Sequence, residues 1–201
     1  MAEENTGKKL IVGFDLDGVI ASPLFDGVLI NIRILKEHLL KSLGRKKDYF
    51  YPKTRVERWA WVLLNRLRQP NGDLTGLKEL KKTAVSLCLI TSRFRFLEPD
   101  TRQWLSKYGL DKIFDSIYIN NSDLNPIDFK ASVLNENLIN YYVDDDLEVL
   151  LALNKRVRSR LYLLGDKKQL SEKTLEKVSS VDEFVSLITR DIGGRNTIPE
   201  F

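Results

Sequence analysis

The stretch that decides the fold of this chain lies near its start and reads Lys9-Leu10-Ile11-Val12-Gly13-Phe14-Asp15-Leu16-Asp17-Gly18. Residues 9–14 are a short apolar run bounded by charges, which indicates a buried parallel strand. Asp15 and Asp17 follow at its carboxyl end, and Gly18 allows a sharp turn beside a bound group. Two carboxylates this close repel unless a cation lies between them, so the stretch favours a divalent metal held by oxygen; the alternative is an ordinary turn or helix cap.

Composition limits the class of protein. The chain has 201 residues, 43% apolar and 30% charged, which can bury the core of one domain with a small inserted module. No apolar stretch approaches the roughly 20 residues that cross a bilayer, and the first residues lack the order of a secretory signal, so we expect a cytoplasmic protein without membrane contact. With one histidine and one cysteine, Cys88, which we expect to be buried, a zinc cluster is excluded and magnesium-type chemistry is favoured.

Strand-like and helix-like segments alternate along most of the chain. Beyond the first strand, strands are predicted at residues 84–90, 116–119, 141–143 and 160–164, and helices at residues 74–82, 97–108, 126–137, 147–153, 171–178 and 181–192. This rhythm predicts an α/β domain with a largely parallel sheet.

Residues 21–75 interrupt that alternation. They are interpreted as all-helical, with helices at residues 27–43 and 54–68, and they carry eleven basic and five acidic residues, a net charge of +6 against −2 for the remainder. We therefore predict a core of residues 1–20 and 76–201 and a helical cap of residues 21–75. Ligands bind at the carboxyl edge of such sheets, where the cap leaves and returns, so it is placed as a lid. A basic lid favours an anionic ligand, although basic faces are also ordinary solvated surface.

Three further groups of polar residues follow predicted strands or begin a helix. Thr91 and Ser92 end the second strand of the core, Lys130 lies near a helix start, and Asp144-Asp145-Asp146 ends the strand at residues 141–143. A turn or helix cap, a surface lysine and a helix cap are the structural alternatives for these groups. Three adjacent acids are unfavourable without a counter-charge, so we interpret Asp144 and Asp145 as a functional pair and Asp146 as the cap.

Taken together, these motifs resemble those of the haloacid dehalogenase-like (HAD) hydrolase superfamily. Its first motif is similar to residues 14–19, its second to residues 87–91, its third to Lys130 and its fourth to residues 141–145. The resemblance implies a Rossmann-like three-layer sandwich with a cap inserted after the first strand. Phe129-Lys130-Ala131 and Ile90-Thr91-Ser92-Arg93 resemble the 5′(3′)-deoxyribonucleotidase-like branch, from which Leu164-Gly165-Asp166-Lys167-Lys168 departs.

The resemblance also implies roles for these residues. Asp15 would attack phosphorus to give an aspartyl-phosphate, and Asp17 would serve as general acid and then as general base. Thr91, Ser92 and Lys130 would hold the phosphoryl oxygens. Magnesium would be bound by Asp15, by the main-chain carbonyl of Asp17 and by the pair Asp144 and Asp145.

The expected substrate is a small phosphomonoester, first a (deoxy)nucleoside 5′-monophosphate, with sugar phosphates and nucleic-acid ends as alternatives. The cap mixes cations with aromatic residues, as a surface that stacks bases and holds phosphate would, and its candidate substrate contacts are Arg45, Lys46, Tyr49 and Arg55. Two other readings stay open: a phosphomutase using the same residues, and a non-catalytic protein that binds a nucleotide or a partner. Nucleic acid is the less favoured ligand, and the oligomeric state is open.

Overall fold

The computed structural model describes residues 9–23, 51–165 and 175–195. At its centre is a six-stranded sheet in the order β5-β4-β1-β6-β7-β8, whose neighbouring strands all pair in parallel. The strands are β1 (Leu10–Asp15), β4 (Val85–Thr91), β5 (Ser116–Ile119), β6 (Tyr141–Asp144), β7 (Arg160–Leu164) and β8 (Glu176–Val178). The predicted α/β fold with a parallel sheet is confirmed.

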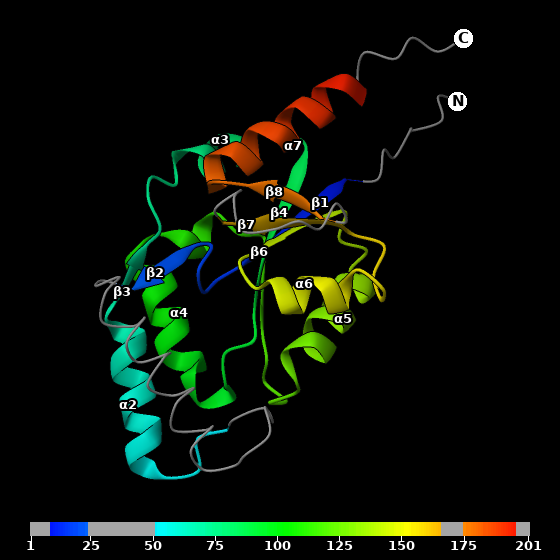
Figure 1. Ribbon diagram of the computed structural model, residues 1–201. Coiled ribbons are helices and arrows are strands. Elements are labelled where there is room, and N and C mark those ends of the chain that lie inside the picture. The colour runs from blue at the N-terminus through cyan, green and yellow to red at the C-terminus, as the bar shows by residue number, and fades with distance from the viewer. Residues whose placement is uncertain (1–8, 24–50, 166–174, 196–201) are drawn as a thin grey trace, which may run out of the picture.

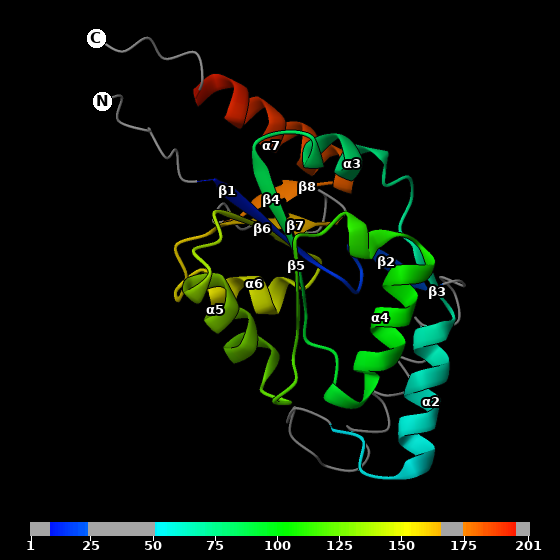
Figure 2. The same cartoon turned by 180° about the vertical axis from the view of Figure 1, so that it is seen from behind.

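Helices cover both faces of this sheet and complete a three-layer arrangement (Figures 1 and 2). Helices α3 (Thr75–Lys81) and α7 (Val181–Arg195) lie together over one face, and α5 (Pro126–Glu136) and α6 (Leu147–Leu153) lie over the other. Helix α4 (Glu98–Lys107) follows the 3₁₀ turn η1 (Arg95–Leu97) and precedes η2 (Leu110–Lys112). None of the helices in the described ranges is long and apolar enough to cross a bilayer.

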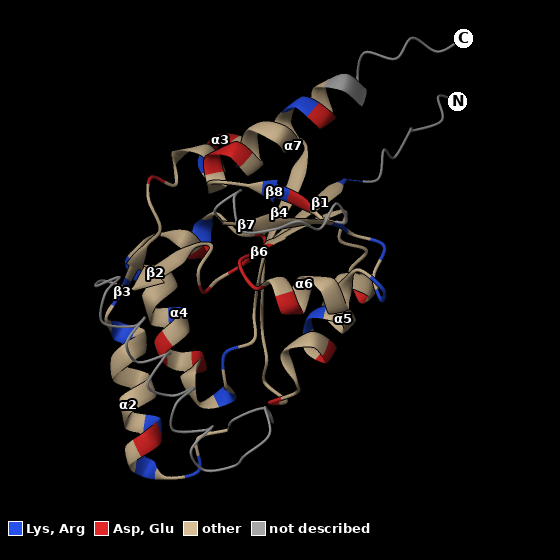
Figure 3. Ribbon diagram, in the orientation of Figure 1, with Lys and Arg blue, Asp and Glu red and all other residues tan. Residues whose placement is uncertain are grey.

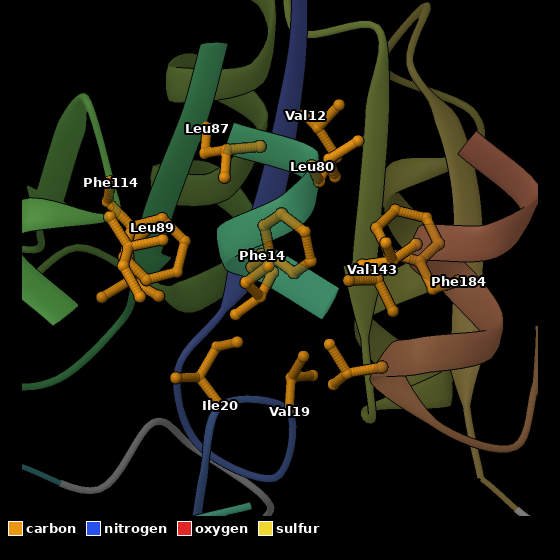
Figure 4. Close-up of a cluster of buried hydrophobic side chains, with 14 of the residues drawn as sticks. Val12, Phe14, Val19, Ile20, Leu80, Leu87, Leu89, Phe114, Val143 and Phe184 are labelled. Atoms are coloured by element: carbon orange, nitrogen blue, oxygen red, sulfur yellow. The ribbon is translucent and has the colours of Figure 1, made fainter. Parts of the chain in front are cut away.

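The core on the α3 and α7 side is built around Phe14 of β1. Its ring meets the rings of Phe114 and Phe184 edge-on, with centroids 5.9 and 5.3 Å away. Figure 4 shows how strands and helices contribute side chains around it, with Val12, Val19, Ile20, Leu80, Leu87, Leu89 and Val143 labelled. Burial of this cluster supplies the hydrophobic stabilisation that holds β1 at the centre of the sheet.

The opposite face of the sheet has its own apolar cluster under α5 and α6, which includes Cys88, Ile90 and Tyr142. Burial raises the pKa of the Cys88 thiol to about 12, and the expectation that this cysteine is buried is confirmed. Because both faces are covered, the central strands are continuous apolar runs, as the sequence indicated for residues 9–14.

The segment at residues 21–75 is only partly helical, and the all-helical prediction is wrong at its two ends. Strands β2 (Ala21–Pro23) and β3 (Arg68–Pro70) pair antiparallel, Ala21 with Pro70, and close the base of the segment. Three residues per strand are too few to show a sequence pattern, and the two strands lie far apart in the chain. The helix predicted at residues 27–43 lies outside the described residues, and the domain limits stay a prediction.

Helix α2 (Arg55–Arg66) matches the helix predicted at residues 54–68. Thr54 begins it with a capping box, in which its hydroxyl accepts from the Glu57 amide at 3.2 Å while Glu57 Oε2 accepts from the Thr54 amide at 2.9 Å. The helix lies beside α4 and η1, so it packs against the segment that leaves β4 (Figure 2).

The helix predicted at residues 171–178 is wrong where the structure describes it. Residues 176–178 are β8, which extends the sheet by parallel pairing with β7 and buries Val178 completely. A strand of three residues is too short for its periodicity to be told from that of a helix, and here pairing with β7 decides the conformation. The remaining predicted core elements agree with the structure to within a few residues.

Candidate active site

The carboxyl edge of the sheet gathers the acidic residues that follow the strands. Strands β1 and β6 are neighbours and pair Phe14 with Val143, so Asp15 and Asp144, the next residue of each strand, come side by side. Both are almost fully buried, at 5% and 1% exposure. Figure 3 shows the acidic run between β6 and α6 at this edge. The parallel register therefore brings the first and fourth sequence motifs together.

Lys130 joins these two carboxylates. Its Nζ lies 2.8 Å from Asp15 Oδ1 and 2.7 Å from Asp144 Oδ2, inside the protein. Asn125 caps α5 through the Ile127 amide at 2.9 Å and so sets the helix start, which places Lys130 one turn further on. Burial would lower the pKa of Lys130, but the adjacent carboxylates outweigh it and raise the pKa, so the ammonium is fixed in its charged form.

Oxygen atoms of Asp15, Asp144 and Asp145 lie within 4.8 Å of one another. Burial, aided by the charges of Asp144 and Asp17, raises the pKa of Asp15 in spite of Lys130. Desolvation by the surrounding groups, and then the charge of Asp144, raise the pKa of Asp145 to about 7, although the residue as a whole is exposed at the sheet edge. One ammonium thus faces three carboxylates, and the remaining repulsion is what a divalent cation with oxygen ligands relieves. The donor set fits magnesium.

Asp145 is positioned against the turn that follows β1. Gly18 has a φ of +91°, and a Cβ at this residue would stand 2.0 Å from Asp145 Oδ2. Only glycine combines this backbone conformation with so close an approach. The turn is closed by the Gly18 amide, which donates to the Ala21 carbonyl at 2.8 Å. The sharp turn predicted at Gly18 is confirmed. The absence of a side chain at Gly18 leaves room for the Asp145 carboxylate.

Asp17 stands apart from the lysine and is held by two arginines. Arg93 donates from Nε to Asp17 Oδ2 at 2.8 Å and from Nη2 to Oδ1 at 2.6 Å. Arg68 of β3 places Nη1 2.7 Å from the same Oδ1. Burial alone would raise the pKa of Asp17, but the charges of Arg93 and Arg68 overcome it and lower the pKa to about 2. The two arginines therefore favour the ionised form of the carboxyl over the protonated one.

Comparison with known proteins identifies the fold. No family model matches the chain, and no curated protein matches it in sequence. Among solved structures, a HAD phosphatase from Thermococcus onnurineus is 18% identical, with a TM-score of 0.63 over 92% of this chain and 98% of that one. The chain has the HAD-hydrolase fold.

Other HAD structures agree over nearly the whole length. A HAD-superfamily hydrolase of subfamily IA from Geobacter sulfurreducens is 16% identical with a TM-score of 0.55, covering 89% of this chain and 98% of its own. YfnB from Bacillus subtilis, described as a candidate HAD-hydrolase bound to magnesium, is 12% identical with a TM-score of 0.66, covering 89% and 98%. The resemblance to the HAD superfamily is thus confirmed at the level of fold, whereas the deoxyribonucleotidase-like branch stays a prediction.

Thr91 and Ser92, at the end of β4, lie at the same edge of the sheet as Asp15. Strand pairing sets Asp15 opposite Ile90, which puts Thr91 one residue further along the same edge. The Thr91 hydroxyl is buried and accepts from the Arg93 amide at 3.3 Å. Ser92 Oγ is buried and has no hydrogen-bond partner within the described ranges. Their contact with phosphate stays a prediction.

The predicted substrate contacts of the cap are only partly described. Arg45, Lys46 and Tyr49 lie outside the described residues, and Arg55 is an exposed residue at the start of α2. The expected cation-aromatic surface does have a counterpart among the described residues, where Arg58 lies 5.8 Å from the Tyr51 ring centroid and 5.6 Å from that of Phe96. These aromatic residues join α2 to the chain that follows β4.

Three residues of the site were missed as functional candidates in the sequence. They are Arg68, Arg93 and Tyr142, whose hydroxyl donates to Asp144 Oδ2 at 2.9 Å. Arg93 could have been found, because a cation two residues after the end of a strand must lie near the acids at that edge. Arg68 gave no such signal, since it reaches Asp17 only through the pairing of β2 with β3.

Asp146, the last acid of the run after β6, has a structural role. Its side chain accepts from the Val149 amide at 3.2 Å and begins α6 as the helix cap. Asp144 and Asp145 are left as the pair that faces Asp15. The structure thus separates the three acids as the sequence predicted.

Proposed function

We propose that this chain is a magnesium-dependent phosphohydrolase that acts on a small phosphomonoester through an aspartyl-phosphate. The observation that carries the proposal is the bridge from Lys130 to Asp15 and Asp144, at 2.8 and 2.7 Å, beside a third carboxylate. A buried nucleophile, a fixed ammonium and a group of oxygen ligands together suit phosphoryl transfer, in which charge must be neutralised on both sides of phosphorus.

Asp15 is the candidate nucleophile. One of its oxygens forms a bond to phosphorus while the bond between phosphorus and the ester oxygen breaks, and water then releases inorganic phosphate and restores the carboxylate. Lys130 contacts Asp15 directly, so it orients the carboxylate and offsets the charge of the arriving phosphate. The hydroxyls of Thr91 and Ser92, at the same edge of the sheet, are the candidate donors to the phosphoryl oxygens.

Asp17 is the candidate general acid and base. It donates a proton to the leaving ester oxygen in the first step and takes one from water in the second. Because Arg93 and Arg68 favour the ionised carboxylate, Asp17 can accept a proton from water in the second step. The first step needs a protonated carboxyl, so at least one guanidinium must move away from it when substrate binds.

Asp15, Asp144 and Asp145 would hold the magnesium ion, with the main-chain carbonyl of Asp17 as a further candidate ligand. Bound there, magnesium supplies the positive charge that lets an anionic nucleophile approach an anionic phosphate. Lys130 and Tyr142 both donate to Asp144 Oδ2 and so hold the Asp144 carboxylate in position for the metal.

Nucleoside 5′-monophosphates are the first substrates to test, followed by sugar phosphates and phosphorylated nucleic-acid ends, and the cytoplasm is the proposed location. The aromatic residues beside Arg58 support a planar group in the substrate, and a phosphomutase that uses the same residues is the alternative within catalysis. A protein that binds ligand without turnover is the alternative from another class, and the presence of all four HAD motifs in one place favours the enzyme.

The test is phosphate release from these substrates and a generic aryl phosphate, with magnesium or with chelator. Asp15→Asn removes the nucleophile and is compared with Asp128→Asn, which changes an exposed acid on α5 that pairs with Arg156. We expect release that requires both magnesium and Asp15 and is unchanged in the control. A folded protein that releases phosphate from none of the substrates, or equally well without Asp15, would disprove the proposal.

A further inference from the structure

Two guanidinium groups converge on the carboxylate of Asp17 from different parts of the chain. Arg93 leaves the end of β4 in the core, and Arg68 belongs to β3, at the return of the segment at residues 21–75. Both reach the same oxygen, Oδ1, at 2.6 and 2.7 Å. Two guanidinium groups thus contact a single carboxylate.

The two arginines differ in how firmly they are held. Arg93 has 5% side-chain exposure, and all three of its nitrogens are engaged, two by Asp17 and Nη1 by the Thr101 hydroxyl at 3.2 Å. Arg68 has 20% exposure and contacts Asp17 through Nη1. A guanidinium offers five donors in one plane, so Arg68 can bind a further anion from the solvent side while Arg93 stays in place.

A third donor lies three residues before Arg68 in the chain, near the end of α2. Asn65 is 4% exposed, and its amide nitrogen is buried without a hydrogen-bond partner among the described residues. It shares a face of α2 with Trp61, whose ring lies 5.6 Å from that of Phe94, the residue after Arg93. An unpaired buried donor is costly, so Asn65, three residues before the Arg68 that contacts Asp17, is a candidate donor to a ligand bound at Arg68.

We propose that Arg68 and Asn65 select phosphomonoesters whose leaving group carries a second anionic group, a carboxylate or another phosphate, close to the ester oxygen. The inference rests on the proposed function, because the leaving group stands beside Asp17 only if Asp17 acts on that ester oxygen. Guanidinium and amide groups present donors alone here, and a carboxylate or phosphate accepts from such donors in a bidentate manner. A neutral nucleoside makes no use of this charge, so the inference ranks nucleoside 5′-monophosphates below substrates with an anionic leaving group. A cationic alcohol is repelled by the same charge.

The experiment compares leaving groups that have the same two-carbon length and differ in charge. The substrates are 2-phosphoglycolate, 2-hydroxyethyl phosphate, phosphoethanolamine and ethylene glycol bisphosphate, each assayed for kcat/KM with magnesium. We expect the anionic leaving groups to exceed the neutral one about tenfold or more, the size of a charge-assisted hydrogen bond, and the cationic one to be the poorest. Whichever of 2-phosphoglycolate and the bisphosphate is faster identifies the carboxylate or the phosphate as the preferred anion.

Variants assign this preference to the residues. Arg68→Gln should lower the ratio of kcat/KM for 2-phosphoglycolate over 2-hydroxyethyl phosphate to near one, and Arg68→Lys should restore part of it. Asn65→Leu should lower the same ratio by a smaller factor. Arg66→Gln is the matched control, because Arg66 is two residues away and pairs with Asp100 on α4. Thermal melting shows that each variant is folded.

The outcomes separate this inference from the proposed function. A wild-type protein that hydrolyses no phosphomonoester overturns both. Hydrolysis of aryl phosphate that needs magnesium and Asp15, but with equal kcat/KM for the anionic and neutral two-carbon substrates, leaves the phosphohydrolase and overturns the inference. A preference that survives in Arg68→Gln also overturns it.

Discussion

Arg93 binds Asp17 through two hydrogen bonds, from Nε at 2.8 Å and from Nη2 at 2.6 Å, although the two residues are 76 positions apart in the chain. This fork geometry is the strongest arrangement available between a guanidinium and a carboxylate. It joins the ends of β1 and β4, which carry the first and second of the polar motifs found in the sequence. The candidate acid is therefore attached to the strand that supplies Thr91, and not to the lysine that holds Asp15.

Lys130→Met should destabilise the protein strongly and make its stability depend on magnesium. The substitution leaves Asp15 and Asp144 buried without their shared cation, which costs about 3–5 kcal/mol. A divalent cation supplies the missing charge, so excess magnesium should restore part of the loss by binding the folded state. Urea unfolding with chelator and with magnesium measures both effects.

The control for this prediction is Lys78→Met, which removes an exposed lysine from α3. It should change the free energy of unfolding by less than about 0.5 kcal/mol. If the two variants lose the same stability in chelator, the ammonium of Lys130 does not compensate the acidic group, and the site described here is wrong.

Gly18→Ala should weaken magnesium binding, whereas Gly72→Ala should not. Both glycines have a positive φ, of +91° and +72°, so both substitutions strain the backbone. Only at Gly18 does the new Cβ meet Asp145, at 2.0 Å from Oδ2, while nothing lies within 4 Å of a Cβ at Gly72. Displacing the carboxylate should cost about 10-fold to 100-fold in metal affinity.

Isothermal titration calorimetry measures the magnesium affinity of both variants, at temperatures chosen so that the two variants are equally stable. Equal affinities would show that Asp145 is not a ligand, and the ion would then have to be held by Asp15 and Asp144 without it. A loss of affinity confined to Gly18→Ala would assign Asp145 to the metal and explain why residue 18 of the first motif is a glycine.

Much of the fold could be predicted because local sequence patterns determine its strands and helices. The central strands are buried on both faces, so runs such as residues 84–90 are apolar throughout and stand out from their surroundings. Asp15, Thr91 and Asp144 could be brought together without a structure, because parallel strands present their carboxyl ends at a single edge. Local sequence therefore sufficed for the acidic part of the site.

The remaining features depend on contacts between distant segments. The pairing of Ala21 with Pro70, and of Arg68 with Asp17, joins residues about fifty positions apart through strands of three residues. Such strands carry no periodicity of their own, and the conformation of β8 is likewise decided by its neighbour β7. For the same reason Arg68 could not be placed on Asp17 from the sequence, whereas Arg93, two residues after the end of β4, could have been.

Stability should depend on pH through Asp115, whose carboxylate accepts from the Leu87 amide at 2.9 Å and pairs with Lys81. Partial burial would raise the pKa of Asp115, but these bonds outweigh it and the pKa lies below its ordinary value. A lowered pKa means that the stabilisation is complete above about pH 4, the ordinary value for an aspartate, and is lost as the pH falls through the folded-state pKa.

Asp115→Asn should therefore be less stable than the wild type at neutral pH, and the gap between the two should close as the pH falls below about 4. Urea unfolding between neutral and acidic pH measures the gap, with Asp111→Asn, an exposed acid nearby, as control. A gap that stays constant with pH would show that the carboxylate charge contributes nothing and that only the hydrogen bond to Leu87 matters.

Asn65→Leu should stabilise the protein, in contrast with Asn71→Leu. The amide nitrogen of Asn65 is buried without a partner in the described part of the chain, so an apolar side chain of similar size removes a desolvation cost of about 1–3 kcal/mol. Asn71 donates from Nδ2 to the carbonyls of Gly18 and Val19 at 3.2 and 3.1 Å, and its loss should destabilise the turn after β1. Thermal melting of the two variants measures both signs. If Asn65 binds ligand at the expense of stability, Asn65→Leu should melt at a higher temperature and show a reduced preference for anionic leaving groups. A lower melting temperature would show that Asn65 stabilises the fold instead.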